Sequence, residues 1–210
     1  MNGDDPVRSS LRVMEIAAVP LKQFDLAKAR MAVGFDATQR EKLGRAVAAH
    51  TLDVVAGALG AVWVVTSDAA VADWAGERGA RIILERRTGL NAAASRVIEL
   101  AGAGRWMILH SDLPLLTSED VSSAWNGIPR DGFLLAPSRD GGTSVFAGEA
   151  PAPSLAYGPG SFHRHLAGVR RYPVQVITRT GFLLDVDAPS DYAAAARHPR
   201  GSWLDRAIGR

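Results

Sequence analysis

Cysteine is absent from all 210 residues of the sequence. This absence excludes disulfide bonds, zinc sites built on thiolates and cysteine nucleophiles, and it suits a reducing compartment, so we expect a cytoplasmic protein. Long apolar runs are also absent, since none approaches the roughly 20 residues that a membrane span needs. Residues 1–12 are polar and lack the apolar core of a signal peptide, so we expect a flexible tail there and no membrane partner.

A strong excess of either charge is missing as well. The chain has 24 lysines and arginines against 22 aspartates and glutamates, which gives a net charge of +2. This mild excess fits a small anionic substrate and is too weak to predict nucleic-acid binding. Hydrophobic residues make up 47% of the chain, which is typical of a globular protein. The length suits one α/β domain over residues 13–210 better than two domains.

Apolar runs and helical periodicity alternate over the first two-thirds of the chain. This alternation predicts right-handed βαβ crossovers and a three-layer α/β fold, whose mostly parallel mixed sheet is covered on both faces. We expect strands at residues 13–19, 61–66, 81–84, 106–109, 133–136, 143–147, 174–177 and 182–184. We expect helices at residues 37–58, 69–78, 90–103, 117–125 and 189–197, and another that Ser161 caps. We expect a loop with at most one turn of helix at 21–31, and peripheral last residues.

One buried strand ends beside a carboxylate. The apolar run Trp106–Leu109 is followed by a polar break that contains Asp112, and Pro114 cannot continue a central strand because it has no N–H. Ligands of open α/β sheets bind at the carboxyl ends of strands, so Asp112 is a candidate site residue. The alternative is an ordinary aspartate that caps the next turn.

A second acidic segment follows the apolar residues 182–184. Asp185 and Asp187 are two positions apart, and on an extended backbone their side chains point to the same side. If Asp112 faces them across adjacent strand ends, three carboxylates share one crevice and need a neutralising cation. Oxygen ligands of this kind, completed by waters and phosphates, are typical of Mg²⁺. The alternative is two unrelated acidic turns.

Two further regions have the composition of anion sites. Lys22, Lys28 and Arg30 follow the first strand, where a triphosphate would lie, although a solvated basic loop is the alternative. The turns at residues 140–143 and 158–161 combine glycines with a hydroxyl and free N–H groups, although they could be ordinary turns.

Several common motifs are missing. The sequence has no G-x-x-x-x-G-K-[ST], no complete G-x-G-x-x-G and no G-x-S-x-G, so it carries no signature of a P-loop protein, a classical dinucleotide site or an α/β-hydrolase. His163 and His165 could form a metal pair, but no third nitrogen or sulfur ligand is near them in the sequence. We therefore expect both histidines on a solvated or phosphate-facing helix start.

A series of short motifs runs in order from about Met14 to Tyr192. They are V-P-L-K, A-K-x-R-M, T-S-D, G-L-N-x-A, S-D-L-P-L-L, D-G-G-T, Y-G-x-G-S-F-x-x-H and L-x-D-V-D-x-P-x-D. In these motifs the chain resembles the family of 2-phospho-L-lactate guanylyltransferases, also described in bacteria as phosphoenolpyruvate guanylyltransferases, which act in the biosynthesis of coenzyme F-420. The resemblance implies a single-domain nucleotidyltransferase fold of the Rossmann-like, GT-A-like type.

The resemblance also implies roles for individual residues. Mg²⁺ would be held by Asp112, Asp185 and Asp187, and the acceptor's phosphate and carboxylate by Thr143, Gly158 and Ser161. The nucleotide would contact Lys22, Lys28, Arg30, Leu90 and Asn91, and the catalytic residues would be Lys22, Lys28 and Asp112.

The implied reaction transfers GMP from GTP to a small phosphorylated carboxylic acid and releases pyrophosphate. The acceptor's phosphate is already anionic at neutral pH, so no general base is needed. The acceptor could be phosphoenolpyruvate, 2-phospho-L-lactate or 3-phosphoglycerate, and its labile product would benefit from handover to the next enzyme of the pathway. Two alternatives remain open, namely a sugar-phosphate or molybdopterin nucleotidyltransferase, and a non-catalytic GTP-binding module. Against the first, Ala17–Pro20 replaces the glycine-rich stretch that those enzymes have.

Overall fold

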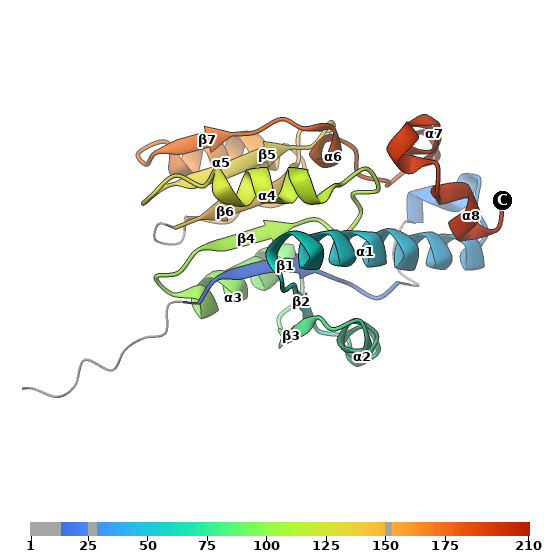
Figure 1. Cartoon of the computed structure of the whole chain (residues 1–210), viewed down its shortest axis with the longest axis horizontal. Helices are drawn as coiled ribbons and strands as arrows, with labels where there is room; N and C mark the ends of the chain where they lie inside the picture. The colour runs from blue at the N-terminus through green and yellow to red at the C-terminus, as the bar shows by residue number, and fades with distance from the viewer. Residues whose placement is uncertain (1–13, 25–28, 150–152) are drawn as a thin grey trace, which may run out of the picture.

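The computed structural model describes residues 14–24, 29–149 and 153–210, so the expected tail at 1–12 and Lys28 lie outside the described residues. One sheet of seven strands forms the centre of the described part, in the order β3-β2-β1-β4-β6-β5-β7 (Figure 1). The strands are β1 Ile16–Pro20, β2 Trp63–Thr66, β3 Arg81–Leu84, β4 Trp106–Leu109, β5 Phe133–Pro137, β6 Thr143–Gly148 and β7 Val174–Val176. Neighbouring strands are parallel except where β6 pairs with β4 and β5, which confirms a mostly parallel mixed sheet.

Helices cover both faces of this sheet. They are α1 Ala37–Leu59, α2 Ala69–Glu77, α3 Leu90–Ala101, α4 Ser118–Asn126, α5 Ser161–Val169, α6 Thr180–Leu183, α7 Pro189–Arg197 and α8 Leu204–Ile208, with 3-10 turns η1 Ala29–Val33 and η2 Pro199–Gly201. Buried residues of α2, α4, α6 and the second half of α1 lie in one core cluster, and buried apolar residues of α3 and α5 lie in the cluster on the opposite face (Figure 1). None of the described helices is long and apolar enough to cross a bilayer.

Strand β1 shows why the central strands are apolar at every position. Ala17 and Val19 pack in the cluster on the α1 side, whereas Ile16 and Ala18 pack in the cluster on the α3 side. All four side chains are buried, as expected for a parallel strand that helices cover on both faces.

Capping residues define where two of the helices begin. Asp36 accepts a hydrogen bond from the Gln39 N–H before α1, and Thr117 pairs with Asp120 in a capping box before α4. The left-handed Gly60 (φ 76°) ends α1.

The predicted strand at residues 182–184 is wrong, because these residues belong mostly to the short helix α6. A three-residue apolar run does not distinguish a strand from one buried helical turn. Phe182 is fully buried in the α1-side cluster, and the Ser144 hydroxyl donates to its carbonyl oxygen. The chain becomes extended only at Leu184 (φ −113°, ψ 104°).

The last residues are not peripheral, which corrects a second prediction. Leu204 and Ile208 of α8 are buried in a third core cluster, together with Met31 of η1, Leu43 of α1 and Tyr192 of α7. In Figure 1, α7 and α8 lie beside the N-terminal end of α1. The C-terminal segment is therefore part of the folded core.

Candidate functional site

Three carboxylates converge at one edge of the sheet. Asp112 follows β4, while Asp185 and Asp187 lie on the extended segment after α6, and one oxygen from each residue lies within 4.8 Å of the others. The Val186 N–H donates to the Asp112 carbonyl oxygen over 3.1 Å, which joins the two segments. Because the segment is extended, the residues on either side of Val186 both face Asp112, as the two-residue spacing predicts.

The electrostatics of this cluster favour a bound cation. Burial raises the pKa of Asp185 to about 7, and the neighbouring charges of Asp112, Asp140 and Asp187 act in the same direction. Positive charge added nearby would therefore favour ionisation of this carboxyl group at neutral pH. All the ligand atoms offered by the cluster are oxygens, and such atoms fit a hard divalent cation.

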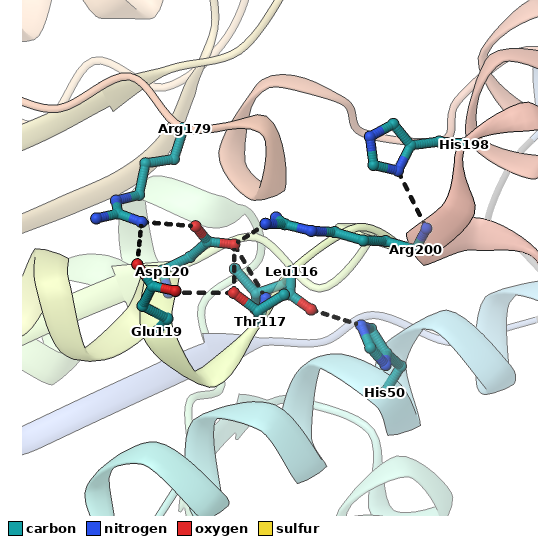
Figure 2. A network of polar contacts seen from close by, with 8 residues as sticks. All are labelled: His50, Leu116, Thr117, Glu119, Asp120, Arg179, His198 and Arg200. Atoms are coloured by element: carbon teal, nitrogen blue, oxygen red, sulfur yellow. Dashed lines mark hydrogen bonds and ion pairs between the residues drawn. The ribbon is translucent and has the colours of Figure 1, made fainter.

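A network of polar contacts around Asp120 anchors the chain on both sides of the segment that carries Asp185 and Asp187 (Figure 2). The buried Asp120 carboxylate accepts hydrogen bonds from Thr117, from Arg179 over 3.4 Å and from Arg200 over 3.2 Å. Arg179 immediately precedes α6 and Arg200 lies in η2. Both ends of the chain segment between them are therefore anchored to the same carboxylate at the start of α4.

A cleft of about 340 Å³ opens next to the carboxylates, which is within the usual size range for a ligand site. Asp112 and Asp187 line it, as do Glu85 and Arg87 beyond β3. The strand order places three spacings between the ends of β4 and β3, which amounts to roughly 14 Å at about 4.8 Å per strand. The cleft is thus long enough to hold an extended ligand across several strand ends.

The structure brings part of the predicted nucleotide site to this cleft. Lys22 and Leu90 line the cleft. Arg30 is exposed on η1, outside the set of described residues that line the cleft. Asn91 is also outside that set, and its side-chain oxygen instead accepts a hydrogen bond from the Tyr157 N–H over 2.9 Å. Asn91 thus holds the turn next to Gly158.

The two glycine turns meet beside the start of α5. The hydroxyl oxygens of Thr143 and Ser161 are 3.0 Å apart, and the Ser161 N–H donates to the Gly158 carbonyl over 3.0 Å. The prediction that Ser161 caps α5 is wrong: Gly160 (φ 67°) takes the cap position, since its left-handed conformation suits glycine, and Ser161 is the first helical residue. Both hydroxyl side chains are buried.

His165 departs from the expectation of a solvated helix start. Its side chain is fully buried, its Nδ1 lies 3.0 Å from the Thr143 hydroxyl, and its Nε2 accepts a hydrogen bond from the Ala156 N–H over 2.9 Å. Burial lowers its pKa to about 4, with smaller effects from Arg164 and His110. His163 is exposed, so the two histidines face different surroundings.

Sequence reasoning missed three residues that line the cleft. Glu85 accepts three hydrogen bonds from Arg87, through the backbone N–H, Nε and Nη2, and these lower its pKa to about 2. His110 also lines the cleft, and its Nε2 is buried without a hydrogen-bond partner among the described residues. The positions of all three just after predicted strands were a usable signal.

Comparison with solved structures defines the class of fold. A candidate nucleotide-diphospho-sugar transferase from Desulfovibrio desulfuricans G20 superposes with a TM-score of 0.74 over 93% of this chain and 96% of that chain, at 16% identity. This likeness, together with the site at the carboxyl ends of the strands, defines an α/β fold of the nucleotidyltransferase type.

Comparison of sequences defines the family. The model of the family described as "Guanylyl transferase CofC like" matches residues 14–202, so the chain belongs to that family. It is 33% identical over 200 residues to a phosphoenolpyruvate guanylyltransferase from Sphaerobacter thermophilus, covering 90% of this chain and 97% of that protein. It is 36% identical over 188 residues to a 3-phospho-D-glycerate guanylyltransferase from Phenylobacterium zucineum, covering 83% and 86%.

Proposed function

We propose that this protein transfers GMP from GTP to the phosphate of a small phosphorylated carboxylic acid, with release of pyrophosphate, in the biosynthesis of coenzyme F-420. The acceptor class includes phosphoenolpyruvate, 2-phospho-L-lactate and 3-phosphoglycerate. Family membership supports the reaction. The observation that carries it to particular residues is the group of three carboxylates at the edge of a cleft large enough for a ligand.

Asp112, Asp185 and Asp187 would hold Mg²⁺, because their oxygens converge and their mutual repulsion needs a cation. The ion would neutralise charge that spreads over the phosphates as they react. On this proposal the charge on Asp185 depends on the occupant of the site, since a pKa of about 7 leaves its carboxyl group only partly ionised near pH 7 when no cation is bound.

The rest of the cleft suits the nucleotide. Lys22 lies at its wall, where an ammonium group would contact the triphosphate, and Leu90 adds an apolar surface. Lys28 and Arg30 belong to the same loop in the sequence, and their contact with phosphate remains part of the proposal. The ionised Glu85 carboxylate can accept hydrogen bonds from a ligand at the β3 end of the cleft, roughly 14 Å from the carboxylate cluster by strand spacing.

The acceptor would bind where the glycine turns meet, next to Thr143, Gly158 and Ser161. An oxygen of its phosphate would attack the α-phosphorus of GTP in line. The bond from that phosphorus to the β-phosphate oxygen would break, and pyrophosphate would leave. Because the attacking oxygen is already anionic, the protein's task is to position two polyanions and to stabilise charge.

The test is release of pyrophosphate from GTP with Mg²⁺, measured with each of the three acceptors in parallel. Each reaction is run alone and with the next enzyme of the pathway, so that a labile product handed over directly is still detected. We expect turnover with at least one acceptor. Binding of GTP without turnover on any acceptor would contradict the proposal and favour a GTP-binding module, and turnover only with sugar phosphates would favour a different nucleotidyltransferase.

A further inference from the structure

His165 lies in a chain of hydrogen bonds that ends at the proposed acceptor site. Its ring is fully buried and packs against the rings of Phe146 and Tyr157, each with a centroid 4.7 Å away. These contacts fix the plane of the imidazole. Nδ1 then faces the Thr143 hydroxyl, which in turn contacts Ser161.

The direction of the first two hydrogen bonds follows from chemistry. A backbone N–H can only donate, so Nε2 of His165 must accept the bond from Ala156 and carries no hydrogen. A neutral imidazole with a bare Nε2 carries its hydrogen on Nδ1. His165 therefore donates from Nδ1 to the Thr143 oxygen.

The two hydroxyl groups of Thr143 and Ser161 then have one hydrogen more than the bond between them uses. Thr143 and Ser161 have one hydroxyl hydrogen each, and only one of them can serve the bond between the two oxygens. The Thr143 oxygen accepts from His165 with one of its two lone pairs, and either hydroxyl can then donate to the other. When Thr143 donates to Ser161, the hydroxyl hydrogen of Ser161 is left for a ligand at the start of α5, beside Gly158 and Gly160.

We propose that His165 is a positioning residue for the acceptor, because it orients the hydroxyls of Thr143 and Ser161 so that Ser161 donates a hydrogen bond to an anionic oxygen of that substrate. The proposal rests on the function proposed above. If Ser161 donates, the substrate group at this site must accept a hydrogen bond through an oxygen lone pair, as phosphate and carboxylate do. The burial that lowers the pKa of His165 supports it, since a neutral ring is what the chain of hydrogen bonds requires.

The decisive test is a double-mutant cycle on acceptor affinity. His165→Gln keeps an amide near Nε2 but loses the donor toward Thr143, and Ser161→Ala removes the final donor. Each substitution alone should weaken phosphoenolpyruvate, 2-phospho-L-lactate or 3-phosphoglycerate binding by about 10- to 100-fold, as expected for a hydrogen bond to a charged group. In the Ser161→Ala background, His165→Gln should weaken acceptor binding by less than about twofold more, because the last hydrogen bond of the chain is already lost. GTP affinity should stay constant throughout.

Three controls separate positioning from folding. His163→Gln makes the same chemical change on the exposed face of α5 and should leave acceptor affinity unchanged. His165→Asn places an amide donor near Nδ1 and should retain more affinity than His165→Gln. Independent effects of His165→Gln and Ser161→Ala that multiply, or equal losses for GTP and acceptor, would overturn the proposal.

Nitrogen NMR of the wild-type protein gives a test that needs neither turnover nor a variant. We expect His165 as a neutral ring with the hydrogen on Nδ1 at pH 7. A hydrogen on Nε2, or a protonated ring, would overturn the proposal even if every variant failed to fold. If the wild type transferred GMP to none of the three acceptors, only the proposed function would be contradicted. The NMR result would still decide the direction of the hydrogen bonds that His165 makes.

Discussion

At Asp185, burial and the neighbouring carboxylates act in the same direction. Its pKa is raised from 3.8 to about 7. Because a metal ion binds the ionised carboxyl group, Mg²⁺ affinity should fall about tenfold per pH unit below pH 7 and level off above it. Calorimetric titration of Mg²⁺ between pH 5 and 8 checks this dependence. An affinity that stays constant from pH 5 to 8 would contradict the assignment.

The same shift predicts how stability changes with pH in the absence of metal. A carboxyl group whose folded-state pKa is raised disfavours folding once it ionises. The destabilisation is absent below about pH 4, grows between pH 4 and 7, and is complete above pH 7. Asp185→Asn should therefore raise the melting temperature at pH 8 in a metal chelator and leave it little changed at pH 4. A lower melting temperature at pH 8 would show that the charge is compensated in another way.

Asp187 offers a direct test of the carboxylate cluster. Asp187→Asn keeps the size of the side chain but removes one negative oxygen, so kcat for pyrophosphate release should fall by about 100-fold or more at fixed Mg²⁺. Circular dichroism should show an unchanged fold. Asp53→Asn, which alters an exposed carboxylate on α1, is the matched control and should have no effect. Near-normal turnover of Asp187→Asn at saturating Mg²⁺ would refute the metal assignment.

Residue types and spacing predicted the carboxylate cluster but not the burial of His165. The two-residue spacing of Asp185 and Asp187 was informative because the backbone there is extended, even though the preceding strand proved to be a helix. His165 looked polar and solvated because its partners Ala156 and Thr143 are distant in the sequence and come together only in the fold. Glu85 was missed for a different reason: its position directly after β3 was a usable signal, but the sequence did not show that Arg87 folds back to hold it at the cleft.

At the level of elements, helix α6 depends on close approach to α4. A side chain on Gly181 would overlap the Asp120 carboxylate and lie 3.0 Å from the Leu116 Cα. Gly181→Ala should therefore lower the free energy of unfolding by about 1–3 kcal/mol, because the Asp120 network must shift. It should also weaken Mg²⁺ binding, since that network anchors the segment that carries Asp185. Urea denaturation and Mg²⁺ titration measure the two effects.

A second glycine provides the control for this prediction. Gly57 lies inside α1, and its added Cβ would meet only the Ser118 Oγ, at an ordinary 3.8 Å. Gly57→Ala should stabilise the protein by roughly 0.5–1 kcal/mol, because alanine loses less conformational entropy in a helix. If both substitutions gave the same change, the close packing of α6 on α4 would not be limiting.

Elements with strong local signals were predictable, and those that depend on tertiary contacts were not. Asp36 and Thr117 mark the starts of α1 and α4 because their side chains bond to the nearby backbone. The α6 turn has no such signal: three apolar residues fit a strand equally well, and Gly181 makes sense only once Asp120 lies opposite it. The small element β7 was predictable to within one residue from its apolar run.

For the molecule as a whole, the C-terminal helix tests whether the third core cluster is essential. Leu204 is fully buried between segments that are far apart in the sequence. Leu204→Ala should lower the free energy of unfolding by about 2–5 kcal/mol in urea denaturation. Val33→Ala, at a position 93% exposed, should change it by less than about 0.5 kcal/mol. A loss below 1 kcal/mol at Leu204 would show that α8 opens independently of the rest.

The reversed direction of β6 has a consequence for how this protein can change over evolutionary time. Because β6 runs antiparallel between β4 and β5, its first residue, Thr143, arrives at the sheet edge where β4 ends. On the proposed assignment, the residues that contact the nucleotide lie before residue 117, those that contact the acceptor lie after residue 137, and the metal carboxylates come from both halves. Selection can therefore exchange one acceptor for another through mutations in the glycine turns of the second half, while the nucleotide loops of the first half and the metal carboxylates are inherited unchanged.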